Sequence, residues 1–252
     1  MKISVITVAY NSAATIADTL DSVAAQSHAD VEHIVVDGGS GDNTLDIVRQ
    51  RGQHVARVVS APDRGIYDAM NKGIALATGD VVGFINSDDF YASTEVLTQV
   101  ATAMADPAVD GCYGDLCYVQ QAQVDTIVRY WRSSAHRPGQ FGRGWVPPHP
   151  TLFLRRSLFA RFGAFDLSYP IAADFELMAR LLEVHRINTV YLPQVLVKMR
   201  LGGTSNRSIG NIVKQNREIW RALAAHHLQP SPLKFIAGKI SSRGRQFFTR
   251  PA

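Results

Sequence analysis

The first half of the chain alternates short apolar runs with amphipathic segments. Runs of nearly continuous apolar residues predict buried strands, and apolar residues repeated every three or four positions predict helices. The predicted strands cover residues 3–10, 32–37, 57–61 and 80–85, and the predicted helices cover 13–26, 44–51 and 66–77. This alternation is typical of an α/β fold with a mostly parallel sheet and helices on both faces.

The second half is less regular. We predict helices at 94–105, 155–162, 175–183 and 209–227, strands at 110–119 and 187–199, and a polar loop rich in glycine and proline at 133–150. That loop is long enough to be functional. We expect one α/β domain over residues 1–205 and a C-terminal appendage over residues 206–252, made of a helix and a basic amphipathic tail.

Composition narrows the class of protein. With 252 residues, 46% of them hydrophobic, the chain can bury a core, which excludes a disordered or fibrous protein. No apolar run reaches the roughly 18 residues of a membrane span, and the first strand begins too early for a cleavable signal, so we expect a cytoplasmic protein. Cys112 and Cys117 fit no zinc or redox spacing and are predicted to be buried and free.

Polar side chains follow the predicted parallel strands, where such sheets bind ligands. Tyr10, Asp37 and the pair Asp88–Asp89 occupy these positions. Because neighbouring side chains on a strand point to opposite faces, we expect Asp88 and Asp89 to divide two tasks, holding a divalent cation and a sugar hydroxyl. A nucleoside diphosphate with Mg²⁺ or Mn²⁺ presents both groups. The alternative is that one of the two carboxylates caps the following helix.

The segment DGGSGDNT, residues 37–44, is a poor match to a dinucleotide-binding fingerprint. It follows the second strand, and Thr44 stands where the third glycine belongs. We expect its glycines to form a turn, with Asp42 or Asn43 capping the next helix. Asp37 remains as a carboxylate that can accept hydrogen bonds from a base or a ribose.

Several segments together resemble the inverting family 2 glycosyltransferases, which have the GT-A fold. They are SVITVAYNSAATIADTLDSVAAQ, VVDGGSGDNT, DRGIYDAMNKGIALATGD, FINSDD, HPTLFLRRSLFARFGAFD and AADFELMARL. The resemblance covers residues 3–205 and is strongest to the bacterial branch that builds exopolysaccharide, colanic-acid-type and cell-surface glycans. It implies a Rossmann-like GT-A sheet.

The resemblance implies a role for each residue near the donor. Asp37 falls on the base-contacting carboxylate, Asp88 on the ribose side, and Asp89 on the ligand of Mn²⁺ or Mg²⁺. Asn86 stands at the first acid of a strict D-x-D motif, so which carboxylate touches the metal stays open. The remaining implied donor contacts are Tyr10, Arg64, Asp68, Asn71 and Arg200. Residues 200–208, with Gly202, Gly203 and Arg207, resemble a loop that closes over the donor.

Sugar transfer needs one base, because a divalent ion can stabilise the departing diphosphate. Asp166, Asp174 and Glu176 are candidates, and the family's base aligns with Asp174. The alternative for Asp174 is a helix cap. His149 could touch the acceptor, the phosphates or the metal, or be structural, and Trp145 could be an acceptor platform or a core residue.

Two other functions compete with glycosyl transfer. A nucleotidyltransferase would carry a basic, glycine-rich first loop, whereas AYNSAAT has neither feature. A non-catalytic protein could use the basic tail to bind lipid or nucleic acid, but acidic strand ends would repel a phosphate backbone, so we expect no nucleic acid. The expected partners are a nucleotide-sugar donor, a glycan or lipid-linked acceptor and, through the tail, the anionic inner face of a membrane.

Overall fold

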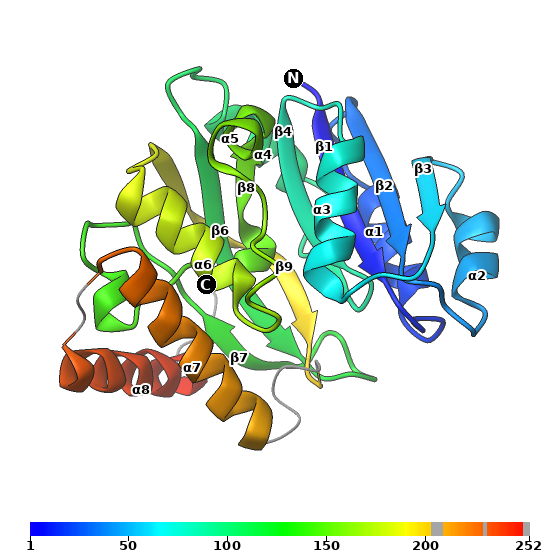
Figure 1. Ribbon diagram of the computed structural model, residues 1–252. Coiled ribbons are helices and arrows are strands. Elements are labelled where there is room, and N and C mark those ends of the chain that lie inside the picture. Colours follow the sequence, from blue (N-terminus) through cyan, green and yellow to red (C-terminus); the bar gives the residue numbers. More distant parts are fainter. Residues whose placement is uncertain (203–208, 229–230, 249–252) are drawn as a thin grey trace.

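The structure is a computed structural model that describes residues 1–202, 209–228 and 231–248. Nine strands of these residues form one sheet in the order β3-β2-β1-β4-β8-β6-β9-β5, with β7 paired to β6 (Figure 1). The strands are β1 Ile3–Ala9, β2 Val31–Asp37, β3 Val55–Ser60, β4 Val81–Asn86, β5 Asp89–Tyr91, β6 Gly111–Val119, β7 Ile127–Trp131, β8 Phe153–Arg155 and β9 Thr189–Arg200.

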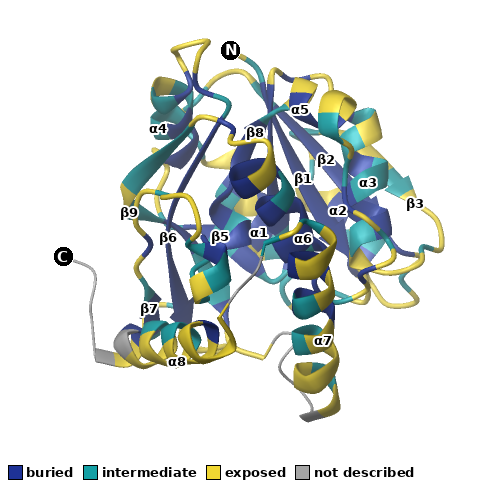
Figure 2. Cartoon of the chain, turned by 60° about the vertical axis from the view of Figure 1, so that its left-hand side comes forward, coloured by how far each residue is buried: buried dark blue, intermediate teal, exposed yellow. Residues whose placement is uncertain are grey.

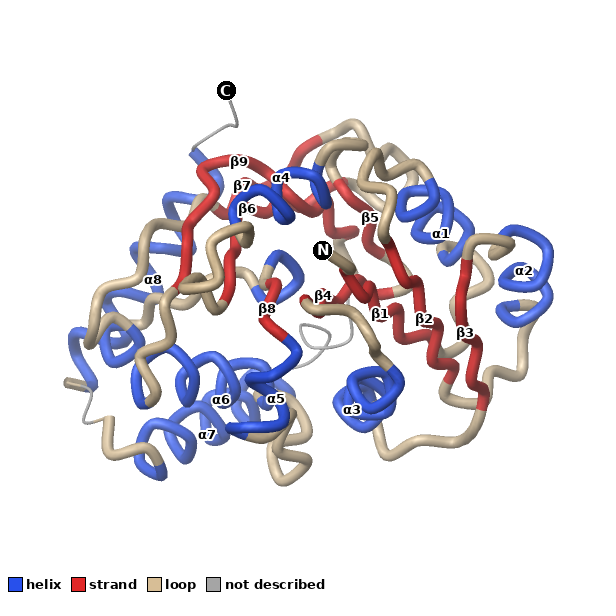
Figure 3. The backbone as a smooth tube through the Cα atoms, turned by 90° about the horizontal axis from the view of Figure 1, so that it is seen from above, coloured by secondary structure: helices blue, strands red, loops and turns tan. Residues whose placement is uncertain are grey.

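Helices cover both faces of the sheet. Figure 3 shows α1, α2 and α4 on one side and α3, α5 and α6 on the other. The helices are α1 Ile16–Ala24, α2 Thr44–Arg51, α3 Ile66–Leu76, α4 Val96–Ala103, α5 Arg156–Phe162, α6 Ala173–Ala179, α7 Ile209–Ala225 and α8 Pro232–Phe248. Two 3-10 turns, η1 Phe141–Arg143 and η2 His149–Thr151, lie in the loop before β8, and a π-helical turn, η3 Arg180–Val184, continues α6. The predicted fold class is confirmed.

The parallel half of the sheet follows the hydrophobic pattern closely. Strand β1 is buried at all seven positions and pairs in parallel with both β2 and β4, so that Ile3 aligns with Val31 and Val81. Their carboxyl ends therefore lie level at one edge. Beyond β4 the pairing changes, because β8 runs antiparallel to both β4 and β6.

Short elements account for the differences from the predicted pattern. Strand β5 has three residues, and so does β8, which ends at Arg155, the first residue of a segment expected to be helical. Three residues are too few to show a periodicity. Strand β7 falls in a segment to which the pattern assigned no element. Cys112 and Cys117 are buried and free, as expected.

The C-terminal tail is a helix that packs on the domain. Phe235 of α8 is 3% exposed and lies 5.1 Å, between ring centroids, from Trp220 of α7. A methyl group on Gly238 would come within 1.9 Å of the Arg143 carbonyl oxygen, so the helix backbone lies directly on η1. The expected domain boundary at residue 205 lies outside the described residues. Among the helices that are described, none has the length and apolar character needed to cross a membrane.

Glu32 ties the amino-terminal edge of the sheet together. Its buried carboxylate accepts hydrogen bonds from Ser4 Oγ at 2.6 Å, from the Thr78 backbone at 2.7 Å and from Thr78 Oγ1 at 2.7 Å, and Lys2 Nζ lies 3.3 Å away. Burial raises the pKa of Glu32, but these donors outweigh it and hold the pKa at about 2, below the ordinary 4.5.

We therefore expect Glu32→Gln to lower the free energy of unfolding by about 3 kcal/mol at pH 7, the value of a pKa shift of this size. A lowered carboxyl pKa stabilises the fold above the unfolded-state pKa, and the effect is lost as pH falls toward 2. Urea unfolding between pH 2 and 7 measures it, with the exposed Glu95→Gln as control. A difference between Glu32→Gln and the parent that does not shrink at low pH would contradict this account.

Candidate active site

The loops that follow β1, β2 and β4 are joined to one another. Ser12 Oγ lies 2.7 Å from Ser87 Oγ, and the Asn11 backbone donates to Ser40 Oγ at 2.8 Å. The Ser12 backbone donates to Thr44 Oγ1 at 2.7 Å. These contacts bring the polar segments after three strands to one edge of the sheet, where the sequence placed them.

Asp37, the last residue of β2, organises its own loop. Its buried carboxylate accepts from the backbones of Gly39 and Ser40 at 3.1 and 3.0 Å, from Ser40 Oγ at 2.5 Å and from Ser60 Oγ at 2.7 Å. Burial raises the pKa of Asp37, but the hydrogen bonds outweigh it, and the net shift is downward. Asp37 is thus an anion that fixes the shape of the loop under any ligand at this edge.

Tyr10 and Asp63 border that loop. Tyr10 is 66% exposed, which is unusual for a tyrosine next to a buried strand. A methyl group on Gly38 would come within 2.5 Å of Asp63 Oδ2 and 3.4 Å of Tyr10 Cδ2, so glycine leaves room for both side chains. Asp63 was not among the predicted site residues. Its place in the segment just after the end of β3, at the same edge of the sheet as Asp37, was the signal that could have found it.

The end of β4 and the residues that follow it contain buried side-chain oxygens that accept no hydrogen bond from the described residues. Asp89 is fully buried at the start of β5, and its Oδ2 accepts from Asn86 Nδ2 at 3.2 Å. No residue in the described part of the chain donates to Asp89 Oδ1 or Asn86 Oδ1. Burial, together with the charge of Asp88, raises the pKa of Asp89 well above its usual range. Asp88 is partly exposed, so it is the more accessible of the two carboxylates.

Arg200, the last residue of β9, holds the backbone of residues 88–90 in place. The guanidinium is 5% exposed, donates to the Asp88 carbonyl at 2.9 Å and pairs with Asp18 of α1. It also lies 5.1 Å from the centre of the Phe90 ring. These contacts hold the backbone on which Asp88 and Asp89 stand. Two residues of the expected donor-closing loop, Gly203 and Arg207, lie outside the described residues.

Arg64 and Asp68 are engaged with each other at the start of α3. Arg64 Nη2 lies 2.8 Å from Asp68 Oδ1, and Lys72 Nζ lies 3.3 Å from Asp68 Oδ2. Hydrogen bonding to Arg64 lowers the pKa of Asp68, so that this carboxyl is ionised. Arg64 is exposed and able to reach a second anion, whereas Asp68 is largely covered by the two cations.

Asn71 holds two parts of the fold together. Its amide nitrogen donates to the Phe165 carbonyl at 2.9 Å, and its amide oxygen accepts from the Phe165 backbone at 3.0 Å. This two-point contact fixes α3 to the segment before α6. The contacts favour a structural role over the donor contact expected from the sequence.

Asp174 lies at the first turn of α6, as expected. Its Oδ1 accepts from Tyr67 OH at 3.0 Å and from the Phe175 backbone at 2.8 Å. Burial and the charge of Asp174 raise the pKa of Tyr67 well above 10, so the phenol stays protonated and can donate. Since Tyr67 belongs to α3, this hydrogen bond couples α6 to the helix that packs on β1 and β2.

The other two base candidates differ in their surroundings. Glu176 is buried and bound by Arg180 Nε at 2.8 Å and His226 Nε2 at 2.7 Å. Burial raises the pKa of Glu176, but the hydrogen bonds from His226 and Arg180 outweigh the effect of burial, so that the net shift of the pKa is downward. Asp166 is exposed and accepts from the Ser168 backbone. Glu176 is therefore a structural anion. Asp174, by contrast, lies where α3 meets α6.

His149 and Trp145 lie in the loop before β8. His149 is 8% exposed and stacks on Phe84 of β4 at 5.6 Å, and no described residue binds its Nε2. Burial lowers the pKa of His149, whereas Asp174 raises it, so the ring is neutral and lies within the field of Asp174. Trp145 is partly buried and packs against Tyr113.

Glu183 of η3 holds the glycine- and proline-rich loop, residues 133–150, by accepting hydrogen bonds from its backbone. The buried carboxylate accepts from the Gly139 backbone at 2.8 Å and from the Phe141 backbone at 3.1 Å, and His136 Nε2 lies 3.4 Å away. The loop is therefore a packed part of the domain, with η1 and η2 as its ordered turns.

Comparison with known proteins agrees with this geometry. The family model for glycosyl transferase family 2 matches residues 4–163. The chain belongs to glycosyltransferase family 2. An uncharacterized glycosyltransferase of Mycobacterium tuberculosis is 36% identical over 183 residues, which are 71% of this chain and 68% of that protein. A PGL/p-HBAD biosynthesis glycosyltransferase of Mycobacterium bovis is 32% identical over 81% of this chain and 78% of its own length.

Solved structures show the same fold. S. aureus TarS 1-349 superposes with a TM-score of 0.67 at 19% identity, covering 96% of this chain and 72% of that one. The Pyrobaculum calidifontis mannosyltransferase PcManGT, in complex with GDP-Man and Mn²⁺, has a TM-score of 0.66 at 20% identity, covering 96% and 68%. The GT-A architecture expected of a family 2 glycosyltransferase is therefore present.

Family membership decides between the competing classes of protein. A family 2 glycosyltransferase uses a nucleotide sugar, so the nucleotidyltransferase and the non-catalytic binding protein are set aside. The two relatives are mycobacterial glycosyltransferases, and they do not single out the exopolysaccharide or colanic-acid-type branch. That finer assignment therefore remains a prediction.

The contacts of Asn71 generate a test that needs no ligand. We expect Asn71→Ala to lower the free energy of unfolding by about 2 kcal/mol, because both polar groups of the Phe165 backbone lose their partner. Urea unfolding of the ligand-free protein measures it. Gln50→Ala, at an exposed position of α2, is the control and should change stability by less than about 0.5 kcal/mol. If Asn71→Ala leaves stability unchanged, the predicted contact of Asn71 with the nucleotide-sugar donor becomes the better explanation of its role.

Proposed function

We propose that this family 2 glycosyltransferase moves a sugar from a nucleoside diphosphate to a hydroxyl of a glycan or lipid-linked acceptor, with inversion at the anomeric carbon. The observation that carries the proposal is the segment 86–89, where buried Asn86 and Asp89 oxygens, to which no described residue donates, lie beside the accessible Asp88. Hard oxygen ligands of this kind suit Mg²⁺ or Mn²⁺ bound together with a diphosphate.

The donor would lie across the loops after β1, β2 and β3. Tyr10 offers an exposed aromatic face to a base, and the loop shaped by Asp37 lies beneath it. The exposed guanidinium of Arg64 can meet phosphate charge. Structures of similar fold support a nucleotide-sugar donor, since TarS was solved with UDP-GlcNAc and PcManGT with GDP-Man.

Asp88 and Asp89 would hold the metal ion, and Asn86 adds an amide oxygen. The bound ion would neutralise charge on the departing diphosphate. Arg200 and Asp18 keep the backbone of this segment in place, so that neither carboxylate has to be reorganised when the donor binds. In this assignment Arg200 is a positioning residue and does not itself contact the phosphates.

Asp174 would act as the base. Its Oδ1 is oriented by Tyr67, and its other oxygen is available to take the proton of the acceptor hydroxyl. The deprotonated oxygen then attacks the anomeric carbon from the face opposite the diphosphate, which inverts the configuration. His149 and Trp145 belong to the loop beside this position, and we assign that loop to the acceptor side.

The last part of the proposal concerns the acceptor and the cellular location of the reaction. One relative is named for a biosynthetic role, in PGL/p-HBAD biosynthesis, which supports a role for this chain in assembling a glycosylated product. We propose that the chain acts in polysaccharide or glycolipid assembly on the cytoplasmic side of a membrane.

The proposed function is tested by donor binding and slow donor hydrolysis. Thermal stabilisation is measured with UDP-, GDP- and dTDP-sugars in the presence of Mn²⁺, since a bound donor stabilises the fold by mass action. Free sugar and nucleoside diphosphate should appear, and chelation should stop their release. Turnover that survives exhaustive chelation, or a transfer product that keeps the donor's configuration, would overturn the mechanism.

We expect Asp174→Asn to reduce transfer by at least about a thousandfold while donor affinity stays within about twofold, because the base acts only on the acceptor. Tyr67→Phe, which keeps the ring stacked on Phe165 at 5.3 Å, should reduce transfer by about tenfold through poorer orientation of Asp174. Donor affinity is measured by calorimetry and transfer by product release. A loss of donor affinity in Asp174→Asn would remove its assignment as the base.

We expect Asp88→Asn and Asp89→Asn to abolish the Mn²⁺-dependent part of donor stabilisation. In metal-free protein Asp89→Asn should not lower the melting temperature, because no residue in the described part of the chain donates to Oδ1 of the buried carboxylate. Differential scanning calorimetry with and without EDTA measures both effects. A large loss of stability in metal-free Asp89→Asn would instead indicate a structural carboxylate.

A further inference from the structure

Helix α8 has an apolar stripe that faces solvent. Leu233, Ile236, Ile240 and Phe247 are 83, 53, 67 and 51% exposed, and at 100° per residue they fall within about 60° of the helix surface. The side chain that anchors the helix, Phe235, points away from this stripe and is buried. Figure 2 shows most of α8 exposed at the edge of the molecule. Four large apolar side chains in a row are therefore at least half exposed in the described structure.

The two C-terminal helices are rich in basic residues, and acids are nearly absent. Residues 209–248 contain seven lysines and arginines and a single acid, Glu218. That acid is buried and accepts from the backbones of Ile171 and Ala172, so it adds no exposed negative charge. On α8 the exposed Arg243 lies about 20° from the edge of the stripe, whereas the exposed Lys234 lies about 100° beyond its other edge.

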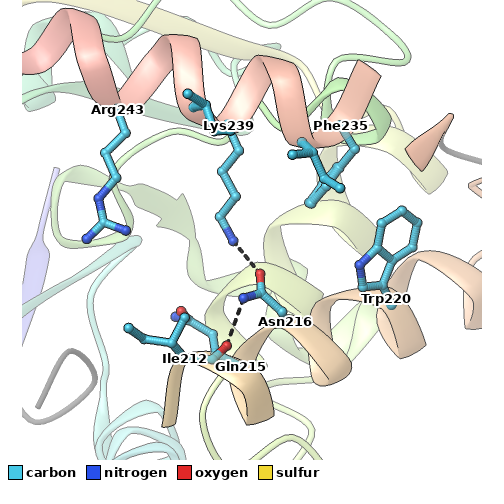
Figure 4. A pocket seen from close by; sticks show the side chains of 9 residues that line it. Ile212, Gln215, Asn216, Trp220, Phe235, Lys239 and Arg243 are labelled. Atoms are coloured by element: carbon cyan, nitrogen blue, oxygen red, sulfur yellow. Dashed lines mark hydrogen bonds between the residues drawn. The ribbon is translucent and has the colours of Figure 1, made fainter. Parts of the chain in front are cut away.

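A groove runs beside the stripe, between α7 and α8 (Figure 4). It has a volume of about 440 Å³, and Ile236 and Ile240 from α8 line it together with Ile212 and Trp220 from α7. At its floor Lys239 Nζ donates to Asn216 Oδ1 at 2.8 Å. Burial, with the charge of Arg243, lowers the pKa of Lys239. An apolar groove beside cations offers a place for a lipid chain below its phosphate.

We propose that α7 and α8 form a docking surface for an anionic phospholipid membrane. The stripe residues enter the interfacial region, an acyl chain occupies the groove, and Lys234 and Arg243 contact headgroup phosphates. The charge pattern favours this occupant, because Arg243 borders the apolar side chains and no acid is exposed among residues 209–228 and 231–248. A polyanion such as nucleic acid would use the charges but would leave the stripe uncovered.

The position of the surface connects docking with catalysis. Figure 1 shows α7 and α8 toward the same end of the molecule as the carboxyl ends of β1, β2 and β4. A protein held by this face would therefore meet acceptors that are attached to lipid at the bilayer surface. This last step rests on the proposed function, whereas the docking itself does not.

The test is sedimentation of the full chain with vesicles of phosphatidylcholine, with and without phosphatidylglycerol, at low and high salt. We expect binding to the anionic vesicles and at least about tenfold weaker binding at high salt or to neutral vesicles. Ile236→Ser/Ile240→Ser and Lys234→Glu/Arg243→Glu should each weaken binding by at least about tenfold. These side chains are exposed, so both variants should keep the parent's melting temperature.

The matched control is Arg57→Glu/Val58→Ser on the edge strand β3, where a cation and an apolar residue are also exposed. It should bind like the parent. Equal binding by the parent and both α8 variants, or no binding at low salt, would overturn the proposal. Donor hydrolysis, measured in the same variants without vesicles, should be unchanged, which separates failure of docking from failure of the proposed function.

Two other occupants give distinguishable results. If the stripe is an interface between copies of this chain, analytical ultracentrifugation will show a dimer that Ile236→Ser/Ile240→Ser converts to monomer, and vesicle binding will be absent. If the surface binds nucleic acid, a random-sequence RNA will bind in a way that depends on Lys234 and Arg243 but not on Ile236 and Ile240. Either result would refute a membrane-docking surface.

Discussion

The parallel register of β1, β2 and β4 is the constraint on which the site depends. Parallel strands that start level also end level, so the loops after them must share one edge of the sheet. The hydroxyls of Ser12, Ser40 and Ser87 then join those loops directly. The donor-side residues either stand at this edge or support it from a neighbouring helix or strand.

The buried carboxylates of this fold differ in how many hydrogen-bond donors stabilise their negative charge. Glu32 and Asp37 are both buried, yet each accepts several hydrogen bonds and has a lowered pKa. Asp89 is buried to the same degree and keeps an oxygen without a donor among the described residues. Leaving a buried carboxylate unsatisfied costs stability, and a divalent cation at this place would offset that cost. The contrast among the three supports a ligand-binding role for the segment 86–89.

The C-terminal helices pack on the loop that we assign to the acceptor. Helix α8 packs on η1 and β7, and its Gly238 lies against the Arg143 carbonyl, so this loop and the appendage share one packed interface. Glu183 holds the same loop from the side of α6. Helix α8 is therefore in direct contact with the loop that carries Trp145 and His149.

The sequence by itself determined the α/β class, the four parallel strands and the helices between them, because strands and helices of this length carry a clear hydrophobic period. It also placed Asp88, Asp89 and Asp174 at element ends, since polar residues beside apolar runs mark those ends. Strand β5, the coupling of Tyr67 to Asp174, the clamp of Asn71 on Phe165 and the support of Asp88 by Arg200 were decided only by the tertiary structure. These contacts join residues up to 112 positions apart, and local spacing carries no information about such pairs.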